Sequence, residues 1–308
     1  MVDNRESVTA KICAFARAWH STYARDKIYD DYLAFDFMGR EEYEDIYDLI
    51  SDGLVDSKKL EKREAEKAIA EYFAPIPLSR IHFNETQLME FATKESASKN
   101  EKIQYVICGA GEDTFSFRNE NDNIEIFEID HPDTQRFKLD RINGLEWIIR
   151  SNVHFVSVDF EKEKMLDKLL EAGFDQNKKT FFSILGVSYY LTLDVFAETL
   201  RQISELSLPG SKVVFDYPNK SGDFPKRVDQ LERITRSLGE VMCGGFDSHE
   251  VKCVLCSLGF RLDKLMNPEQ IQEEYFDGRK DELKAFENVS LLSATYIGRQ
   301  KKVGMNAS

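Results

Sequence analysis

The spacing of apolar residues changes once along the 308-residue chain, near residue 103. Before that point, from about residue 7 to residue 72, apolar side chains such as Ile12 and Phe15 recur every three or four positions, which predicts helices. Pro75 and Pro77 interrupt the pattern, and a further helix is predicted over about Arg80–Ser96. We therefore expect no strand before residue 103.

Beyond residue 103, short apolar runs alternate with amphipathic segments. Runs of this length are typical of buried strands, and the segments between them have the period of helices. This alternation predicts an α/β protein of the Rossmann-like class, in which helices cover both faces of a mostly parallel sheet. The predicted strands are Ile103–Cys108, Ile124–Ile129, Val153–Val158, Phe181–Leu185, Val213–Tyr217 and Val289–Ile297, and the predicted helices lie near Thr134–Asn143, Lys162–Ala172, Leu193–Leu206, Arg227–Leu238 and His249–Leu258.

These patterns divide the chain into two parts of one compact unit. Residues 1–96 are predicted to form a helical cap and a lead-in helix, and residues 97–308 the sheet core. The pattern loosens after Pro218, which predicts an excursion near residues 219–247 and then a hairpin that closes the sheet.

A glycine-rich loop follows the first predicted strand. Glycines at such a point let the backbone of Gly109-Ala110-Gly111 turn sharply and approach a ligand. Asp130 stands 19 positions after Gly111, at the end of the second strand, where a carboxylate can accept hydrogen bonds from ribose hydroxyls. A dinucleotide fingerprint would have a third glycine where Thr114 stands, so the loop favours a nucleoside such as S-adenosylmethionine over NAD or FAD. The alternative is a tight strand-to-helix turn beside a surface acid.

Two further strand ends carry polar or aromatic residues. After the third strand, Asp159 can accept from an exocyclic amine while Phe160 packs on a purine face. The alternative makes Asp159 a helix N-cap and Phe160 a core residue. After Leu185 in the fourth strand, Tyr189 and Tyr190 either wall a pocket and orient a substrate oxygen, or pack on the sheet.

Arg80 begins the helix that leads into the first strand. Because arginine binds a carboxylate through two parallel hydrogen bonds, Arg80 is a candidate clamp for the carboxylate of an amino-acid ligand. The alternative is a solvated surface arginine.

Cys253-x-x-Cys256, with Cys243 and His249 nearby, has the spacing of zinc ligands. The apolar residues around the two cysteines, however, follow a helical period, whereas a zinc knuckle needs a turn. We interpret the stretch as a packed helix and expect no metal.

Composition limits the kinds of molecule that the protein is expected to bind. A net charge of −14 disfavours nucleic acid and anionic membrane surfaces, so a small-molecule partner is expected. No uncharged apolar run reaches the roughly 18 residues that span a bilayer. Five cysteines, an odd number, and no charged-apolar-small leader at the start of the chain predict a reducing cytoplasm. The oligomeric state stays open.

These motifs, in this order, resemble the leucine carboxyl methyltransferase-like family, and within it the bacterial polyketide O-methyltransferase branch. The resemblance covers most of the chain, and its most specific part is the combination of Gly-Ala-Gly-x-Asp-Thr with Glu-x-Asp-His-Pro. The segments that carry it include Ser7–Lys11, Arg17–Ser21, Tyr29–Ala34, Val106–Arg118, Glu128–Pro132, Val158–Phe160, Leu185–Leu191, Phe215–Tyr217 and Gly259-Phe260.

The resemblance implies a class I methyltransferase with a mostly parallel seven-stranded sheet, an N-terminal helical cap and S-adenosylmethionine as cofactor. Many relatives carry a glutamate at the position of Leu185. In this respect the chain is similar to the small-molecule branch, and a protein C-terminal leucine is disfavoured as the acceptor. By the same analogy Arg80 would hold the methionine carboxylate, Gly109, Ala110 and Gly111 would approach the cofactor, Asp130 would bind the ribose, and Asp159 and Phe160 would hold the adenine.

The expected reaction is O-methylation of a carboxylate or hydroxyl on a small molecule, such as a polyketide-like metabolite. A hydroxyl acceptor would benefit from a base, for which Tyr190, His131 and His249 are candidates. The alternatives are an NAD-dependent oxidoreductase on a similar sheet and a non-catalytic protein that binds S-adenosylmethionine. The residues expected to shape the acceptor pocket are Arg17, His20 and Tyr23, in a cap that moves as a lid, and Tyr189 and Tyr190, after the fourth strand.

Overall fold

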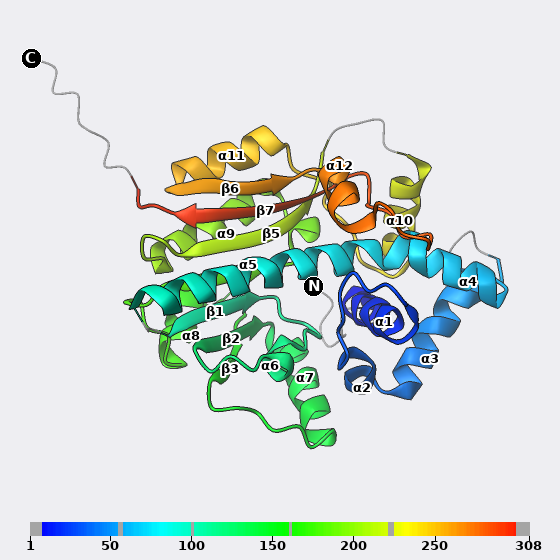
Figure 1. Cartoon of the computed structure of the whole chain (residues 1–308), viewed down its shortest axis with the longest axis horizontal. Helices are drawn as coiled ribbons and strands as arrows, with labels where there is room; N and C mark the ends of the chain where they lie inside the picture. Colours follow the sequence, from blue (N-terminus) through cyan, green and yellow to red (C-terminus); the bar gives the residue numbers. More distant parts are fainter. Residues whose placement is uncertain (1–7, 55–57, 100–101, 160–161, 221–224, 300–308) are drawn as a thin grey trace, which may run out of the picture.

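Seven strands form one sheet in the order β3-β2-β1-β4-β5-β7-β6 (Figure 1). The computed structural model describes residues 8–54, 58–99, 102–159, 162–220 and 225–299. Strands β1 to β5 run parallel to their neighbours among themselves, and β7 runs antiparallel to both β5 and β6. The predicted mostly parallel seven-stranded sheet is therefore confirmed. The strands are β1 Ile103–Cys108, β2 Ile124–Asp130, β3 Val153–Ser157, β4 Thr180–Ile184, β5 Lys212–Pro218, β6 Phe260–Met266 and β7 Val289–Tyr296.

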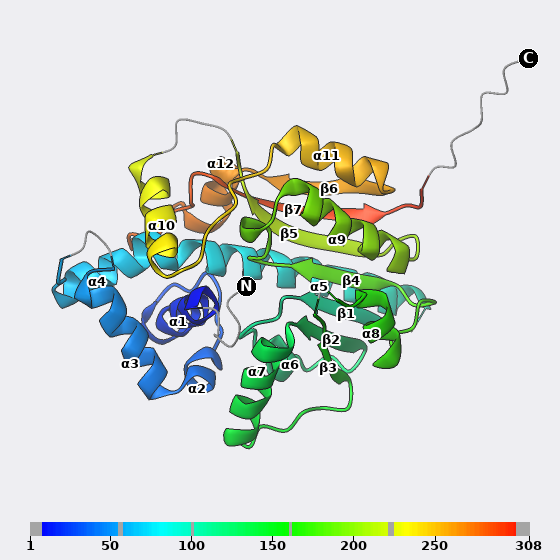
Figure 2. The ribbon, with the colours of Figure 1, turned by 180° about the vertical axis from the view of Figure 1, so that it is seen from behind.

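Helices cover both faces of the sheet, so its central strands are buried on both sides. In β1 every residue is buried; Tyr105 and Ile107 enter one core, while Val106 and Cys108 enter the other. Helix α5 (Pro75–Lys99) covers the first face, and α8 (Met165–Glu171), α9 (Leu193–Leu206) and α11 (Ser248–Ser257) cover the second (Figures 1 and 2). This double burial explains why the strands are apolar runs without polar alternation.

Helix α5 begins earlier than the sequence predicted. Pro75 and Pro77, taken as a break before a helix at Arg80, lie in its first turn. The first N–H groups of a helix have no intrahelical partner, so proline is tolerated there. The helix also packs on β1, β4, β5 and β7. Helix α5 therefore packs against the sheet, although the predicted division between residues 96 and 97 placed it with the cap.

The cap consists of short helices with a core of their own. Phe15 and Ala18 of α1 pack there with Ile46 and Ile69 from later cap helices. Ile234 of α10 (Lys226–Ser237), in the predicted excursion, joins the same core. The cap lies beside one end of α5 (Figure 1). Its helices are α1 Val8–Tyr23, α2 Ala34–Met38, α3 Arg40–Leu49, η1 Ile50–Leu54, α4 Lys62–Ala68 and η2 Ile69–Phe73.

The C-terminal part closes the sheet as a hairpin, as predicted, but the sequence pattern did not locate β6. Residues Arg261, Asp263 and Lys264 give β6 a charged, exposed centre, which is typical of an edge strand. Within the described ranges, no helix combines the length and apolarity needed to cross a bilayer. The remaining elements are α6 Phe115–Arg118, α7 Pro132–Gly144, η3 Ser188–Tyr190, α12 Pro268–Ile271 and η4 Gln272–Phe276.

Candidate cofactor and acceptor site

The loops after β1 and β4 approach each other so closely that only glycine fits at two positions. Gly109 and Gly186 have φ angles of 76° and 73°. A Cβ on Gly109 would lie 2.7 Å from Val187 Cγ2, and a Cβ on Gly186 would lie 2.6 Å from Arg80 Nη1. The glycines therefore let two backbone turns and one guanidinium meet at the carboxyl edge of the sheet, where α/β proteins bind their ligands.

Asp130, at the end of β2, fixes the glycine loop. Its Oδ2 accepts a hydrogen bond from Gly111 N (2.6 Å) and its Oδ1 accepts one from His131 N (2.7 Å). Burial raises the pKa of this carboxyl above its usual value, and the two backbone donors oppose that shift. Each carboxylate oxygen has a second lone pair, so Asp130 can still accept from a ribose hydroxyl. Asp130 is not a detached surface acid.

Arg80 is largely buried, with 12% of its side chain exposed. Its Nη1 lies 3.4 Å from Oδ2 of the fully buried Asp216, and its Nη2 lies 3.5 Å from Cys13 Sγ. Asp216 also accepts from Gly186 N (2.7 Å) and from the Tyr189 hydroxyl (2.8 Å). Arg80 is therefore not a solvated surface arginine, and it lies against the glycine turn after β4.

Arg17 has internal partners. Its Nε lies 2.9 Å from Asp31 Oδ2, and its Nη2 donates to the carbonyl of Glu112 (2.7 Å), two residues before Thr114. Burial alone would raise the pKa of Asp31, but Arg17 and Arg118 hold the pKa below its usual range. Arg17 thus joins the cap to the glycine loop, and its predicted contact with an acceptor stays a prediction.

His20 and Tyr23 lie further along α1. The His20 ring is fully buried, its Nε2 accepts from Ile28 N (2.9 Å), and burial lowers the pKa of the imidazole to about 4. The Tyr23 side chain is 65% exposed. At 1.5 Å per residue, Tyr23 lies roughly 20 Å along the helix from Ala10, which lies next to Gly111. The structure therefore does not bring these two side chains to Arg80.

The two tyrosines after β4 differ in environment. Tyr189 is buried, with its hydroxyl on Asp216, whereas Tyr190 is partly buried. Burial first, and then Glu240, raise the pKa of Tyr190 above its ordinary value. At neutral pH the Tyr190 hydroxyl therefore stays protonated and acts as a donor.

The two candidate histidine bases have contacts of their own. His131 is the N-cap of α7, and its Nδ1 accepts from Asp133 N (3.3 Å). His249 is exposed on α11, with its Nε2 3.6 Å from Cys253 Sγ. The predicted helix around Cys253 and Cys256 is confirmed, and both thiols are exposed on it. No group of three metal-ligating side chains occurs among the residues that the structure describes.

Asp159 and Leu185 follow the ends of strands β3 and β4. The carboxylate of Asp159 lies 2.7 Å from Lys162 Nζ. Phe160 lies outside the described residues. Leu185 follows β4 and packs against the core on the α5 side. The predicted adenine and cofactor contacts of these three residues stay predictions.

Two buried acids were missed as site residues. Asp216 interrupts the apolar run of β5, and a buried acid needs buried partners, so its position was a usable signal. Asp31 had no comparable signal, because the adjacent Asp30 is also an acid and is exposed.

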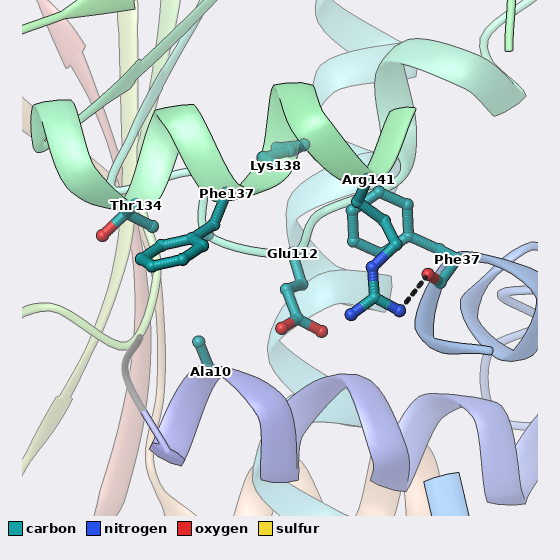
Figure 3. Close-up of a pocket in the computed structure, with 8 residues that line it drawn as sticks. Ala10, Phe37, Glu112, Thr134, Phe137, Lys138 and Arg141 are labelled. Carbon is teal, nitrogen blue, oxygen red and sulfur yellow. Dashed lines mark hydrogen bonds between the residues drawn. The ribbon is translucent and has the colours of Figure 1, made fainter. Parts of the chain in front are cut away.

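A small cavity separates α1, the glycine loop and α7. Figure 3 shows Ala10 of α1 opposite Phe137 of α7, with the side chain of Glu112 extending between the two helices. The cavity has a volume of about 20 Å³, enough for about one water molecule. Helix α1 therefore lies close against Gly111, and a ligand that enters here requires the cap or α7 to shift.

The sheet order, the antiparallel β7, the glycine loop after β1 and the acid after β2 together define a class I methyltransferase fold. Two solved structures have this fold, each at low sequence identity. A DUF574 family protein from Streptomyces avermitilis matches with a TM-score of 0.52 and 15% identity, covering 80% of this chain and 95% of that one. A methyltransferase from Thermobifida fusca matches with a TM-score of 0.51 and 14% identity, covering 81% and 94%.

Sequence comparison identifies the family. The family model for leucine carboxyl methyltransferase matches residues 10–204. YktD of Bacillus subtilis, named as an S-adenosyl-L-methionine-dependent methyltransferase, is 36% identical over 96% of this chain and 99% of its own length. The chain therefore belongs to the leucine carboxyl methyltransferase family. The predicted enzyme class, an S-adenosylmethionine-dependent methyltransferase, is confirmed.

Proposed function

We propose that this enzyme transfers the methyl group of S-adenosylmethionine to an oxygen of a small molecule, at the carboxyl edge of the sheet beneath α1. The observation that carries the proposal is that the turn after β4 contacts both the glycine loop, where Val187 meets Gly109, and the Arg80 guanidinium, at Gly186. A buried guanidinium beside two glycine turns suits the charged end of an amino acid attached to a nucleoside.

The cofactor would extend from Arg80 towards β2 and β3. Arg80 binds the methionine carboxylate, and it has donors beyond the one directed at Asp216. The backbone of the loop from Gly109 through Ala110 to Gly111 lies beside the cofactor, and Asp130 accepts from the ribose. Asp159 and Phe160 would hold the adenine, and Leu185, after β4, would also contact the cofactor.

The bound sulfonium supplies a methyl group that is already activated for displacement. The protein then needs to hold an acceptor oxygen in line with that methyl and to exclude water. Burial and Glu240 keep the Tyr190 hydroxyl protonated, and this hydroxyl orients the acceptor as a hydrogen-bond partner. Helix α1 covers this edge of the sheet, and Arg17 and His20 stabilise the cap from within.

The arrangement favours an acceptor that arrives ionised, such as a carboxylate. Of the three candidate bases, Tyr190 has a raised pKa, His131 caps α7 and His249 is exposed on α11. A carboxylate has already lost its proton at neutral pH and needs no base. The family resemblance suggests a polyketide-like acid as the class of acceptor.

Transfer of a labelled methyl group tests this proposal. The purified enzyme is incubated with methyl-labelled S-adenosylmethionine and fractions of a cell extract, and the products are separated by size and treated with mild alkali. We expect label in a small-molecule fraction, released as volatile methanol by alkali, because a methyl ester hydrolyses and a methyl ether does not. The Arg80→Met variant serves as the control and should lose the transfer.

Each other outcome contradicts a stated part of the proposal. Label that resists alkali would identify a hydroxyl acceptor in place of a carboxylate. Label on protein would exclude a small-molecule acceptor. Binding of S-adenosylmethionine without transfer to any fraction would indicate a non-catalytic binding protein.

A further inference from the structure

The Asp31 carboxylate is surrounded by donors from two parts of the fold. It is 1% exposed. Its Oδ2 lies 2.9 Å from Arg17 Nε, and its Oδ1 accepts from Thr114 Oγ1 at 2.5 Å and lies 3.2 Å from Arg118 Nε. A buried carboxylate with this many charged and neutral donors is held in a single geometry.

These contacts join the cap to the end of the cofactor loop. Asp31 lies between α1 and α2, whereas Thr114 is the N-cap of α6, five residues after Gly109. Arg17 Nη2 also donates to the carbonyl of Glu112. The loop is therefore bound from the cap at two points, Glu112 and Thr114, which lie just beyond the glycines.

The same contacts continue into α5. Arg118 Nη2 lies 2.7 Å from Glu85 Oε1, and the Tyr29 hydroxyl donates to that oxygen at 2.5 Å. Arg118 Nε also donates to Thr114 Oγ1 (2.8 Å). Thr114, which replaces the third glycine of a dinucleotide loop, thus supplies a hydroxyl that glycine lacks and links the cap, α6 and α5.

We propose that Asp31 is a positioning residue that couples the cap to the cofactor loop, so that cofactor affinity depends on the cap and cofactor binding orders the cap. This inference rests on the proposed placement of the cofactor against the loop at residues 109–111. A ligand site held by backbone contacts tolerates only small displacements of that backbone. Loss of the Asp31 charge removes the ion pair that orients Arg17 and weakens the hydrogen bond from Thr114, so both attachments of the loop to the cap are weakened.

Coupling of this kind is reciprocal. If the cap holds the loop in the geometry that binds the cofactor, the bound cofactor must in turn stabilise the cap. If Asp31 were purely structural, its substitution would lower the stability of the fold but leave unchanged the affinity of the folded molecules for the cofactor. Affinity and cap protection, measured on folded protein, therefore separate the two roles.

The test compares Asp31→Asn with Asp30→Asn, at a neighbouring exposed acid that pairs with Lys27. Binding of S-adenosylhomocysteine is measured by calorimetry at a temperature at which circular dichroism shows each variant to be folded. We expect Asp31→Asn to weaken binding about tenfold or more, the effect of one lost hydrogen bond to a charged group. Asp30→Asn should bind as the wild type does.

A milder variant covers the case in which Asp31→Asn does not fold. Thr114→Val removes one donor and leaves both arginines on Asp31. Hydrogen exchange is then followed in α1 and α2 with and without S-adenosylhomocysteine. We expect the ligand to slow exchange in the wild-type cap and to slow it less in Thr114→Val when the ligand is saturating.

The outcomes also separate this inference from the proposed function. If S-adenosylhomocysteine binds the wild type and a folded Asp31→Asn equally, or protects the cap equally in Thr114→Val, the coupling is wrong while the cofactor site stands. If an Arg80 substitution leaves the binding of S-adenosylhomocysteine unchanged, the placement of the cofactor is wrong and this inference fails with it.

Discussion

Arg80 Nη1 lies 3.4 Å from Asp216 Oδ2 and joins helix α5 to strand β5 at the carboxyl edge of the sheet. The contact is long for a charged hydrogen bond, and Asp216 has shorter donors in Gly186 N and the Tyr189 hydroxyl. Asp216 therefore orients the guanidinium without occupying all of the hydrogen-bond donors of Arg80. A residue held in this way can bind a second carboxylate.

Replacement of Arg80 should weaken cofactor binding. We expect Arg80→Met to raise the dissociation constant of S-adenosylhomocysteine roughly tenfold to hundredfold, since a hydrogen bond to a charged group contributes about 1.5–3 kcal/mol. Arg80→Lys, which keeps the charge but loses the two-pronged geometry, should fall between Arg80→Met and the wild type. Calorimetric titration measures all three. Arg201→Met, at an exposed arginine of α9, is the matched control, and an unchanged constant in Arg80→Met would remove Arg80 from the site.

Gly186 offers a test of the close approach between the β4 turn and Arg80. Gly186→Ala places a Cβ 2.6 Å from Arg80 Nη1 and at a positive φ, whereas Gly173→Ala has a positive φ and no heavy atom within 4 Å of the new Cβ. Both substitutions should lower the free energy of unfolding by roughly 1–2 kcal/mol through backbone strain. Only Gly186→Ala should also weaken binding of S-adenosylhomocysteine, because it displaces Arg80. Equal binding by the two variants would show that the guanidinium moves aside without consequence.

A buried ion pair behind the glycine loop is predicted to be essential for stability. Lys138 Nζ lies 2.5 Å from Glu128 Oε2 and donates to the carbonyl of Asp113 (2.6 Å), while Ser116 donates to the other Glu128 oxygen. Lys138→Met leaves the Glu128 charge buried without its cation, which should cost about 3–5 kcal/mol of unfolding free energy in urea denaturation.

Two further variants show whether the cost comes from the uncompensated charge. Adding Glu128→Gln to Lys138→Met should restore part of the stability, because the buried charge is removed. Arg136→Met, on the same helix but in a more exposed pair with Asp133, should cost less than about 1 kcal/mol. If the double variant is as unstable as Lys138→Met alone, the loss is one of packing rather than charge.

The parts of the fold that could be predicted are those that depend on local pattern. The apolar runs after residue 103 predicted six of the seven strands to within one residue at each end, because a strand buried on both faces must be apolar throughout. The glycines and Asp130 were predicted at the site because each follows a strand directly. The start of α5 was misplaced, since prolines in the first turn of a helix resemble prolines that end one.

The parts that could not be predicted depend on pairs far apart in the sequence. Asp31 pairs with Thr114 across 83 positions, and Arg80 with Asp216 across 136. Local spacing contains no information about such partners, so Asp31 was indistinguishable from its exposed neighbour Asp30. Arg17 and His20 were predicted to face an acceptor because they are polar residues in the cap, yet each has a buried partner inside the protein.

The buried imidazole of His20 predicts how stability depends on pH. Because burial lowers its pKa to about 4, the unfolded chain, with an ordinary histidine pKa near 6.5, binds a proton over a range in which the folded protein does not. The contribution of His20 to stability is therefore fully present above about pH 6.5, decreases as the pH falls, and amounts to roughly 3 kcal/mol across the window. His20→Gln can still accept from Ile28 N but cannot titrate, so its unfolding free energy should fall less steeply between pH 6.5 and pH 4. His249→Gln, at an exposed position on α11, should keep the wild-type slope, and equal slopes in wild type and His20→Gln would mean that His20 is not buried in its neutral form.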